Sequence, residues 1–233
     1  MARYIITDIH GCVKTFRELL YHGIKINKND TLYFLGDYTD KGPDSKGVLD
    51  ELLKLREQNY NLSILRGNHD QMLPDTLAGF GLDSWKTDTE KQLTLQSFGV
   101  TDPRKVPRKY HDFILQMPYF YVLPQYYLVH AGFNFTAKRP LDDTYAMMNI
   151  KEYRVNKEIL GGRNLIHGHN AVNLQKVKAT IANANSRINL DAGCVYYKNA
   201  GEGMGNLVAL NLDTMELTVQ PNIDAPYDIE RKK

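Results

Sequence analysis

The sequence predicts an α/β fold in which parallel strands alternate with helices. Three observations support this prediction. Short apolar runs such as Thr31–Leu35 have the length and composition of buried strands. Five such runs are each followed directly by Asp, Gly, His or the sequence Arg-Gly-Asn, and such residues are typical of loops. Segments with the helical spacing of apolar residues lie between the first runs, and this alternation is typical of right-handed βαβ units.

The composition indicates one globular domain. The 233 residues are 42% hydrophobic and 24% charged, which suffices for one sizeable core. A net charge of +2 does not favour nucleic-acid binding. The two cysteines, Cys12 and Cys194, fit a reducing compartment. Since no apolar signal region or membrane-spanning run is present, we expect a cytoplasmic protein without a membrane or nucleic-acid partner.

The first third of the chain reads as strand, helix, strand, helix. Tyr4–Thr7 is the first expected strand, and apolar residues at helical spacing follow from about Val13 to His22. Thr31–Leu35 is the second strand. Pro43-Asp44-Ser45 starts a helix whose apolar face continues to Glu57.

The remaining elements are less regular. Residues 71–117 are expected to form a helical insert, which either walls the substrate cleft and sets specificity or only covers the sheet. The tail from Pro221 is expected to be mobile. The further expected strands are Leu62–Leu65, Tyr119–Leu123, Tyr126–Val129, Asn164–Ile166, Val177–Ile181, Arg187–Leu190, Leu207–Leu212 and Leu217–Val219, the last four in an antiparallel or mixed sheet.

The residues at the strand ends have the chemistry of metal ligands. Asp8 and His10 alternate in an extended segment, so both can face one cation. Carboxylate, amide and imidazole groups suit Mn, Fe or Zn. The full set exceeds the four ligands of a closed structural zinc site: Asp8, His10, Asp37, Asn68, His130 and His169. We therefore expect two divalent ions with Asp37 as the bridge, and such a pair activates a shared water for in-line displacement at phosphorus.

The chain resembles the metallophosphoesterases, and specifically the phosphoprotein-phosphatase family. The resemblance lies in five ordered motifs: Asp8-Ile9-His10-Gly11, Gly36-Asp37-Tyr38-Thr39-Asp40, Gly67-Asn68-His69-Asp70, His130-Ala131-Gly132 and Gly168-His169. The compact size is similar to the small bacterial and bacteriophage-type serine/threonine phosphatases, with the diadenosine-tetraphosphate hydrolases as close relatives. This resemblance implies a four-layer α/β/β/α sandwich of two mixed sheets flanked by helices. It also implies hydrolysis by a metal-bridging hydroxide without a covalent phosphoenzyme.

The resemblance also implies a role for each motif residue. Asp8, His10 and the bridging Asp37 would bind the first metal, and Asn68, His130 and His169 would join Asp37 on the second. His69 would be the general acid that protonates the leaving alkoxide, oriented by Asp40. A carboxylate partner is expected to raise the pKa of His69. Lys41 would hold phosphate oxygens together with Arg154, for which Arg163 is a nearby competitor and a solvated helix arginine the alternative.

Two positions depart from the pattern of the phosphoprotein phosphatases. Lys41 stands where the family usually has arginine, so the bidentate fork is lost and the charge is kept. Asp70 stands where protein phosphatases more often have glutamate and the dinucleotide hydrolases have aspartate. His167, two residues before the motif histidine, is interpreted as a residue of the core or one supporting the ligands.

The sequence leaves three candidate functions open. The first is a serine/threonine phosphoprotein phosphatase with manganese as the expected metal, acting on a phosphoprotein or phosphorylated small molecule. The second is a diadenosine-tetraphosphate hydrolase, which Asp70 favours. The third is a non-catalytic metal-binding scaffold, which would need neither His69 nor Asp40.

Overall fold

The computed structural model describes residues 1–183, 186–227 and 229. Its larger sheet has five strands, and the parallel trio β1, β2 and β3 forms one half of it. The antiparallel strands β8 and β9 extend the sheet beyond β1. In spatial order the strands are β3 (Asn61–Ile64), β2 (Thr31–Phe34), β1 (Arg3–Ile6), β8 (Asn206–Asn211) and β9 (Leu217–Pro221).

The smaller sheet has four strands and is also mixed. Strands β5, β6 and β7 are parallel, and β4 pairs antiparallel with β5. Its strands are β4 (Phe120–Val122), β5 (Tyr126–Val129), β6 (Asn164–His167) and β7 (Arg187–Asn189). The predicted class, two mixed sheets flanked by helices, is therefore confirmed.

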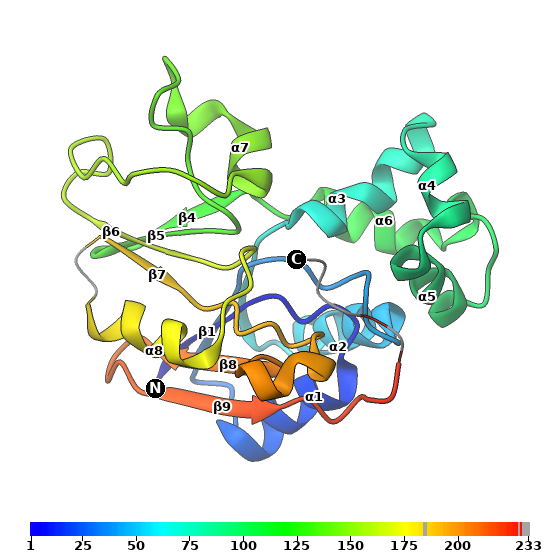
Figure 1. Cartoon of the computed structure of the whole chain (residues 1–233), viewed down its shortest axis with the longest axis horizontal. Coiled ribbons are helices and arrows are strands. Elements are labelled where there is room, and N and C mark those ends of the chain that lie inside the picture. Colours follow the sequence, from blue (N-terminus) through cyan, green and yellow to red (C-terminus); the bar gives the residue numbers. More distant parts are fainter. Residues whose placement is uncertain (184–185, 228, 230–233) are drawn as a thin grey trace.

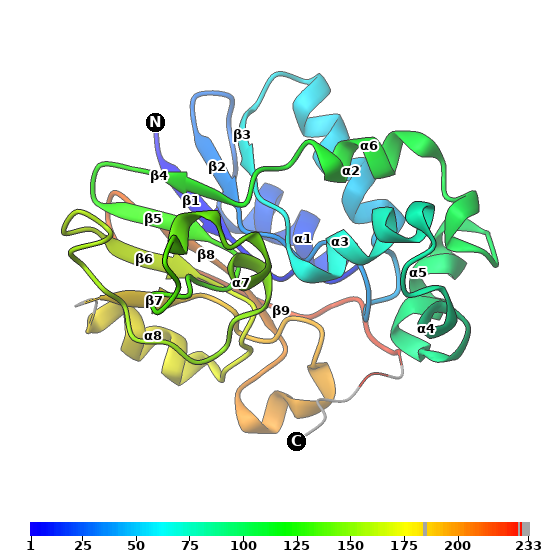
Figure 2. The ribbon, with the colours of Figure 1, turned by 90° about the horizontal axis from the view of Figure 1, so that it is seen from above.

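The helices cover the sheets unevenly. In Figures 1 and 2, α3 to α6 project to one side of the sheets as a helical lobe, whereas α8 and α7 lie beside the smaller sheet. The α-helices are α1 (Val13–Glu18), α2 (Ser45–Glu57), α3 (Asn68–Asp75), α4 (Leu82–Thr87), α5 (Thr89–Phe98), α6 (Arg108–Leu115), α7 (Thr144–Asn149) and α8 (Leu174–Ala182). A π-helical turn (Leu19–Gly23) continues α1, and short 3₁₀ turns lie at Thr76–Ala78, Pro103–Lys105, Pro140–Asp142 and Tyr197–Glu202.

Three apolar clusters join these layers. One lies between the larger sheet and the helices α1 and α2, and it contains Phe16 and Leu52. A second lies between the two sheets and contains Ile5 and Ile166. A third, with Met147 of α7, covers the outer face of the smaller sheet. Burial of these side chains fixes the two sheets face to face.

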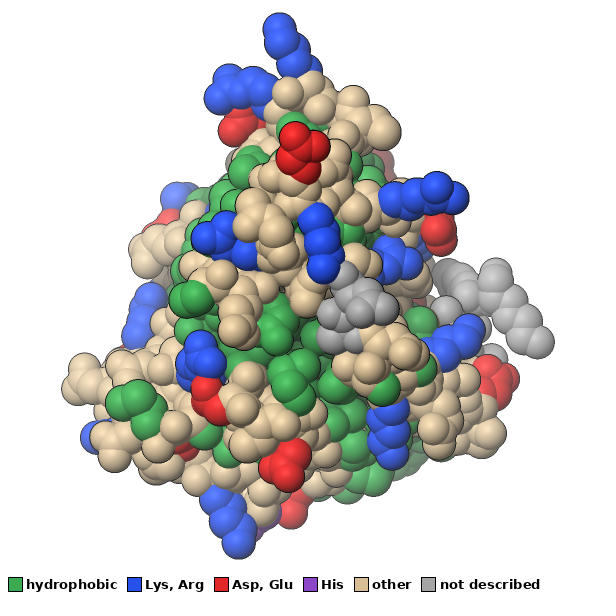
Figure 3. Space-filling model, turned by 90° about the vertical axis from the view of Figure 1, so that its left-hand side faces the viewer, with side chains coloured by type: hydrophobic (Ala, Val, Ile, Leu, Met, Phe, Trp, Pro, Cys, Tyr) green, Lys and Arg blue, Asp and Glu red, His purple; other side chains and the backbone are tan. Residues whose placement is uncertain are grey.

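Basic and acidic side chains are interspersed on the molecular face away from the helical lobe (Figure 3). Among the described residues, no helix is both long enough and apolar enough to cross a bilayer.

The strand predicted at Val177–Ile181 is wrong, because this segment lies in α8. The Asn173 side chain accepts a hydrogen bond from the Lys176 N–H at 2.9 Å and so caps the helix. Val177 and Ile181 are four residues apart and share one helix face, with Val177 fully buried in the core between the sheets. The other final strands divide between the sheets, since β7 joins the smaller one and β8 and β9 the larger.

The mobile tail predicted from Pro221 is not what residues 222–227 show; residues 228 and 230–233 lie outside the described part. Asp224 is 6% exposed and reaches the N-terminus of α1. Its carboxylate accepts hydrogen bonds from the N–H groups of Lys14 and Thr15, at 2.9 and 2.8 Å, and from the Thr15 hydroxyl at 2.6 Å. The segment after β9 thus satisfies backbone donors that Cys12, the residue before α1, leaves without a side-chain cap.

Asp224→Ala should lower the free energy of unfolding by about 1–3 kcal/mol, because it leaves buried helix N–H groups without an acceptor. Urea denaturation of the full chain measures this change. The matched control is Asp83→Ala, since the Asp83 side chain is 99% exposed and its ion pair is with exposed Lys86; its effect should stay within about 0.5 kcal/mol. Equal effects of the two substitutions would contradict the capping role of Asp224.

Candidate metal and phosphate site

The predicted ligands gather where the carboxyl ends of the parallel strands of both sheets meet. Loops after β1 and β2 carry the motif residues from Asp8 to Lys41, and the first turn of α3, which follows β3, carries Asn68 to Asp70. Loops after β5 and β6 carry His130 and His169. They border a cleft of about 410 Å³. Six residues predicted from the sequence line it: His10, Asp37, Lys41, Asn68, His69 and His169. Asp8, Asp40 and His130 lie buried just behind this lining.

Asp37 stands between two imidazoles. Its Oδ2 lies 3.4 Å from His10 Nε2, and its Oδ1 lies 3.4 Å from His130 Nε2. Two groups of donor atoms close enough to hold a cation share this carboxylate, one with His10 and His69 and one with His130 and His169. A carboxylate that offers one oxygen to each side is suited to bridge two ions.

The donor set fits divalent cations. The Nδ1 atoms of His10 and His130 contact the carbonyl oxygens of Thr39 and Leu35, at 2.9 and 2.8 Å, so these nitrogens carry the protons and Nε2 keeps its lone pair. Burial lowers the pKa of both imidazoles, which favours the neutral form that binds metal.

Acceptor atoms converge on the second half of the site. Asn68 Oδ1 lies 3.1 Å from His130 Nε2 and 3.0 Å from His169 Nδ1. Three acceptor atoms therefore lie close together, namely Asp37 Oδ1, Asn68 Oδ1 and His130 Nε2. None of these three atoms carries a proton that it could donate to the other two. A cation satisfies such a cluster, and nitrogen and oxygen ligands accommodate Mn, Fe or Zn.

Asp8 is placed differently from the other predicted ligands. Both of its carboxylate oxygens accept a hydrogen bond from the His169 N–H, at 3.0 and 3.1 Å, and Oδ2 also contacts the Thr7 hydroxyl. His69, and not Asp8, completes the close group around His10 and Asp37. Burial, Asp191 and Asp37 raise the pKa of Asp8 well above its usual value, and a cation bound nearby would favour the ionised carboxylate.

The loops of the site have a strained backbone. The described residues include nine non-glycine positions with positive φ, and six of them are site residues with φ between 46° and 67°. Left-handed backbone costs an ordinary residue about 1–2 kcal/mol, so this concentration indicates a function for these loops. The six are Asp8, His10, Asp37, Asp40, Lys41 and His169.

Asp70 holds the strained loop after β2 in place. Its fully buried carboxylate accepts hydrogen bonds from the N–H groups of Gly67, Asp37, Tyr38 and Thr39, at distances of 2.8 to 3.2 Å. The sequence singled out Asp70 only as an indicator of substrate class. Its position in the first turn of α3 was a signal for this N-terminal capping role.

The His69–Asp40 pair is formed as predicted, but the predicted rise in the His69 pKa is not what the structure shows. His69 Nδ1 lies 3.1 Å from Asp40 Oδ2. Burial and Lys41 lower the pKa of His69 to about 3, and burial raises the pKa of Asp40 to about 7. Desolvation therefore outweighs the charge of the carboxylate in the protein alone. Negative charge on a bound phosphoryl group would act in the opposite direction.

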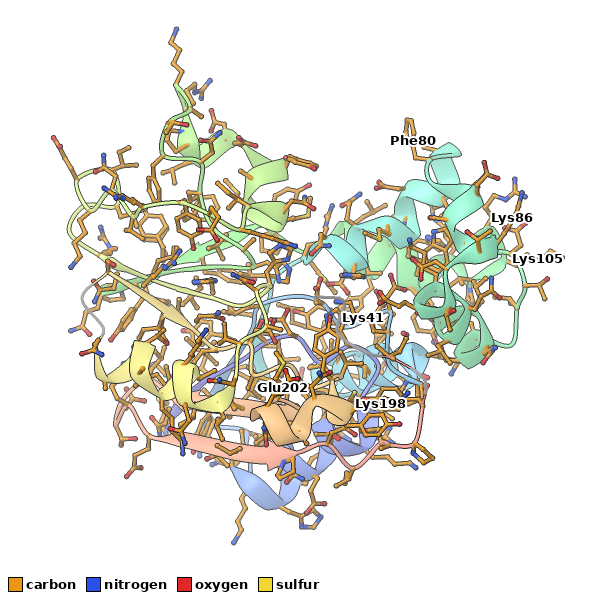
Figure 4. All side chains as sticks on the ribbon, viewed as in Figure 1. Lys41, Phe80, Lys86, Lys105, Lys198 and Glu202 are labelled. Atoms are coloured by element: carbon orange, nitrogen blue, oxygen red, sulfur yellow. The ribbon has the colours of Figure 1, made fainter. Side chains whose placement is uncertain are left out.

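Lys41 lines the cleft and lies in the interior of the molecule in Figure 4, whereas Phe80, Lys86 and Lys105 lie on the helical lobe at its edge. Lys198 and Glu202 lie on the Tyr197–Glu202 turn. The Lys41 ammonium lies 2.9 Å from His10 Nε2 and 5.9 Å from the centre of the Tyr196 ring. Lys41 thus places one positive charge beside the carboxylate of Asp37.

Arg154 does not line the cleft. It is exposed, and its competitor Arg163 instead donates to the carbonyl oxygens of Leu123 and Leu160, at 3.1 and 3.3 Å. Lys151, which no motif of the sequence marked, is the second lysine of the lining.

The helical insert supports the site from behind. Among the residues that line the cleft, none comes from 71–117. Thr94 of α5 donates to Asp40 Oδ1 at 2.8 Å, and the Glu90 carbonyl accepts from the Lys41 N–H at 3.3 Å. The insert is therefore positioned to control the orientation of Asp40 and Lys41.

Gly168→Ala should remove bound metal, because a Cβ at this position would lie 1.9 Å from Asp8 Oδ2 and 2.2 Å from the Thr7 hydroxyl oxygen. Metal per chain, measured by elemental analysis after dialysis against Mn²⁺ and gel filtration, should fall by half or more, about one of the two ions. Gly201→Ala is the control, since a Cβ there meets no atom within 4 Å. Full metal content in Gly168→Ala would contradict the close packing of this loop against the ligands.

Comparison with known proteins places these motifs in a family. A sequence model described as the calcineurin-like phosphoesterases matches residues 1–201. The symmetrical bis(5'-nucleosyl)-tetraphosphatase of Buchnera aphidicola subsp. Schizaphis graminum is 40% identical over 79 residues, 34% of this chain and 28% of that protein. The enzyme of the same name from Nitrosospira multiformis is 30% identical over 132 residues, 57% of this chain and 44% of that protein. The matched segments thus span less than half of these relatives.

Solved structures support the same fold. A candidate diadenosine tetraphosphatase has a TM-score of 0.64 at 22% identity, with 96% of this chain and 94% of that chain covered. A serine/threonine phosphatase from Saccharomyces cerevisiae has a TM-score of 0.57 at 14% identity, with 99% and 82% covered.

Proposed function

The chain belongs to the calcineurin-like phosphoesterase family, and on that premise we propose that it is a metal-dependent hydrolase of dinucleoside polyphosphates such as diadenosine tetraphosphate. The observation that carries this substrate class is the similarity to segments of symmetrical bis(5'-nucleosyl)-tetraphosphatases. It replaces the phosphoprotein as the first choice of substrate.

The chemistry of the cleft supports a polyphosphate substrate. Lys41 and Lys151 enter it from two different loops and can each bind a phosphate oxygen. Tyr145 of α7 is 74% exposed and lies on the lining, and Tyr196 lines it as well. An aromatic ring at the mouth of a phosphate-binding cleft can stack on a nucleobase.

We assign the residues of the chain as follows. Asp37 would hold both cations, with His10 and Asp8 on one side and Asn68, His130 and His169 on the other. Two divalent ions lower the pKa of a shared water and neutralise phosphate charge. Lys41 orients the phosphoryl oxygens, and Asp40 fixes the ring of His69 through Nδ1. Negative charge on a bound phosphoryl group would raise the pKa of His69, and the resulting imidazolium, with its Nδ1–H held by Asp40, would give its Nε2 proton to the oxygen that leaves phosphorus.

The phosphoprotein phosphatase remains the second candidate, because of the same His69–Asp40 pair. An alkoxide from serine or threonine is a poor leaving group and requires a proton donor. The leaving group of a phosphoanhydride is a nucleotide phosphate, which is stable without one. The dependence of the rate on His69 therefore distinguishes the two chemistries.

His69→Asn should reduce kcat for a phosphothreonine peptide by about 10²–10⁴-fold and for diadenosine tetraphosphate by less, with metal content unchanged. Steady-state kinetics and elemental analysis on the same Mn²⁺-loaded preparations give both quantities. Asp37→Asn is the comparison, since it should lose metal and activity on both substrates. Full activity of His69→Asn toward the peptide would overturn the assignment of the acid.

The wild-type protein should prefer diadenosine tetraphosphate to a phosphothreonine peptide in kcat/KM by at least about two orders of magnitude, or about 3 kcal/mol of differential transition-state binding. Both substrates are measured in one buffer with Mn²⁺. A preference of this size for the peptide would instead establish the second candidate.

A further inference from the structure

A second cavity lies beside the metal cleft. It has a volume of about 460 Å³ and lies between α8 and strands β6 and β7. Below it is called the α8 pocket. Nine residues line it: His167, Asn170, Val172, Lys176, Ala179, Thr180, Asn183, Arg187 and Asn189. Asn170 also lines the metal cleft, so the two cavities are neighbours across the loop that follows His169.

His167 gives the α8 pocket an unused acceptor. This residue is only 5% exposed, and it belongs to neither group of close metal-binding atoms. Its Nδ1 lies 2.9 Å from the Gly168 carbonyl oxygen and therefore carries the proton. Its buried Nε2 has no hydrogen-bond partner in the described part of the chain. A buried imidazole nitrogen without a donor is rare in a folded protein, and this one belongs to a residue on the wall of the pocket.

The uncharged residues of the lining suit a nucleobase. Val172 and Ala179 provide apolar wall, and Asn170 and Asn183 provide amide groups of either hydrogen-bonding sense. Such a combination suits a planar heteroaromatic ring with an exocyclic amine.

The charged residues of the pocket are all basic. Lys176 and Arg187 are the two cations, and no acidic residue is among the nine. Arg187 also contacts Tyr153, with its guanidinium carbon 5.1 Å from the ring centre and Nη1 3.4 Å from the Tyr153 carbonyl oxygen. This contact fixes the arginine beside the pocket, while Lys176 is exposed and can move toward an anion.

We propose that the α8 pocket binds a nucleoside phosphate, namely the half of a dinucleoside polyphosphate that extends beyond the metal cleft. This inference rests on the proposed function for the identity of the ligand. A polyphosphate held at Lys41 and the metal ligands can continue past Asn170 into the pocket. There the base lies against Val172 and Ala179 beside the imidazole of His167, and Lys176 and Arg187 hold the adjacent phosphate.

The experiment compares three variants of α8 in the full, Mn²⁺-loaded chain. Lys176→Glu reverses the charge at the pocket, and Ala179→Trp fills it from an exposed helix position. Lys178→Glu makes the same charge change on the same helix at a residue that does not line the pocket. The readouts are KM and kcat for diadenosine tetraphosphate and for p-nitrophenyl phosphate, which is too small to reach the pocket.

Lys176→Glu should raise KM for diadenosine tetraphosphate by about tenfold, the effect of losing one charge-assisted contact. Ala179→Trp should raise KM by a similar factor, because the indole occupies the pocket. Both variants should leave the kinetics with p-nitrophenyl phosphate unchanged. Lys178→Glu should change KM by less than about twofold. An unchanged KM in Ala179→Trp, or equal effects of Lys176→Glu and Lys178→Glu, would overturn the proposal.

A separate measurement keeps this test independent of the proposed function. If the wild-type chain does not hydrolyse diadenosine tetraphosphate, calorimetric titration with ADP still measures binding at the pocket. Loss of one binding event in Ala179→Trp, with Lys178→Glu like wild type, would support the site although the proposed substrate is wrong. An identical isotherm for wild type and Ala179→Trp would exclude nucleotide binding there.

Discussion

The position of the Asp37 carboxylate is the constraint on which the rest of the site depends. Its two oxygens face His10 and His130, which come from different sheets. The His69 N–H donates to Asp37 Oδ1 at 3.1 Å, and a Cβ on Gly67 would lie 2.2 Å from the same oxygen. Only close packing of the two sheets brings the imidazoles to opposite sides of one carboxylate, so the core between the sheets and the site depend on each other.

The strain in these loops is offset by hydrogen bonds that continue the pairing of β1 with β2. The N–H groups of Asp8, His10 and Gly11 donate to carbonyl oxygens of residues 36 to 38, at 2.9 to 3.2 Å. In the loop after β2, the carboxylate of Asp70 accepts hydrogen bonds from the N–H groups of Asp37 and Tyr38. With these bonds in place, left-handed residues that each cost about 1–2 kcal/mol can persist, and the side chains are held before any ligand arrives.

The sequence predicted most of the strands, and the motif residues at their ends do come together, because the same local signal marks both. A short β-branched run that ends at Asp, Asn or His fixes the strand, and parallel pairing then brings the ends together, as at Asp37 and Asn68. The prediction failed where tertiary contacts decide. Val177–Ile181 has the composition of a strand, but the Asn173 cap and one buried face make it helical. The contact between Asp224 and α1 spans about two hundred residues and has no local signal.

The charge balance of the site argues for more cation than the chain itself supplies. Asp8, Asp37 and Asp191 are all at most 4% exposed, and Asp191 and Asp37 both act to raise the pKa of Asp8. Lys41 is the one cation of the motif residues, and its ammonium already contacts His10. A cation close to buried carboxylates favours their ionised form. Burial lowers the pKa of the neighbouring imidazoles and favours their neutral form, so a bound divalent ion would be a further source of positive charge beside Asp8. The lowered pKa values of His10 and His130 and the raised pKa of Asp8 thus share one first cause, desolvation, and a bound cation would favour the metal-binding form of all three groups.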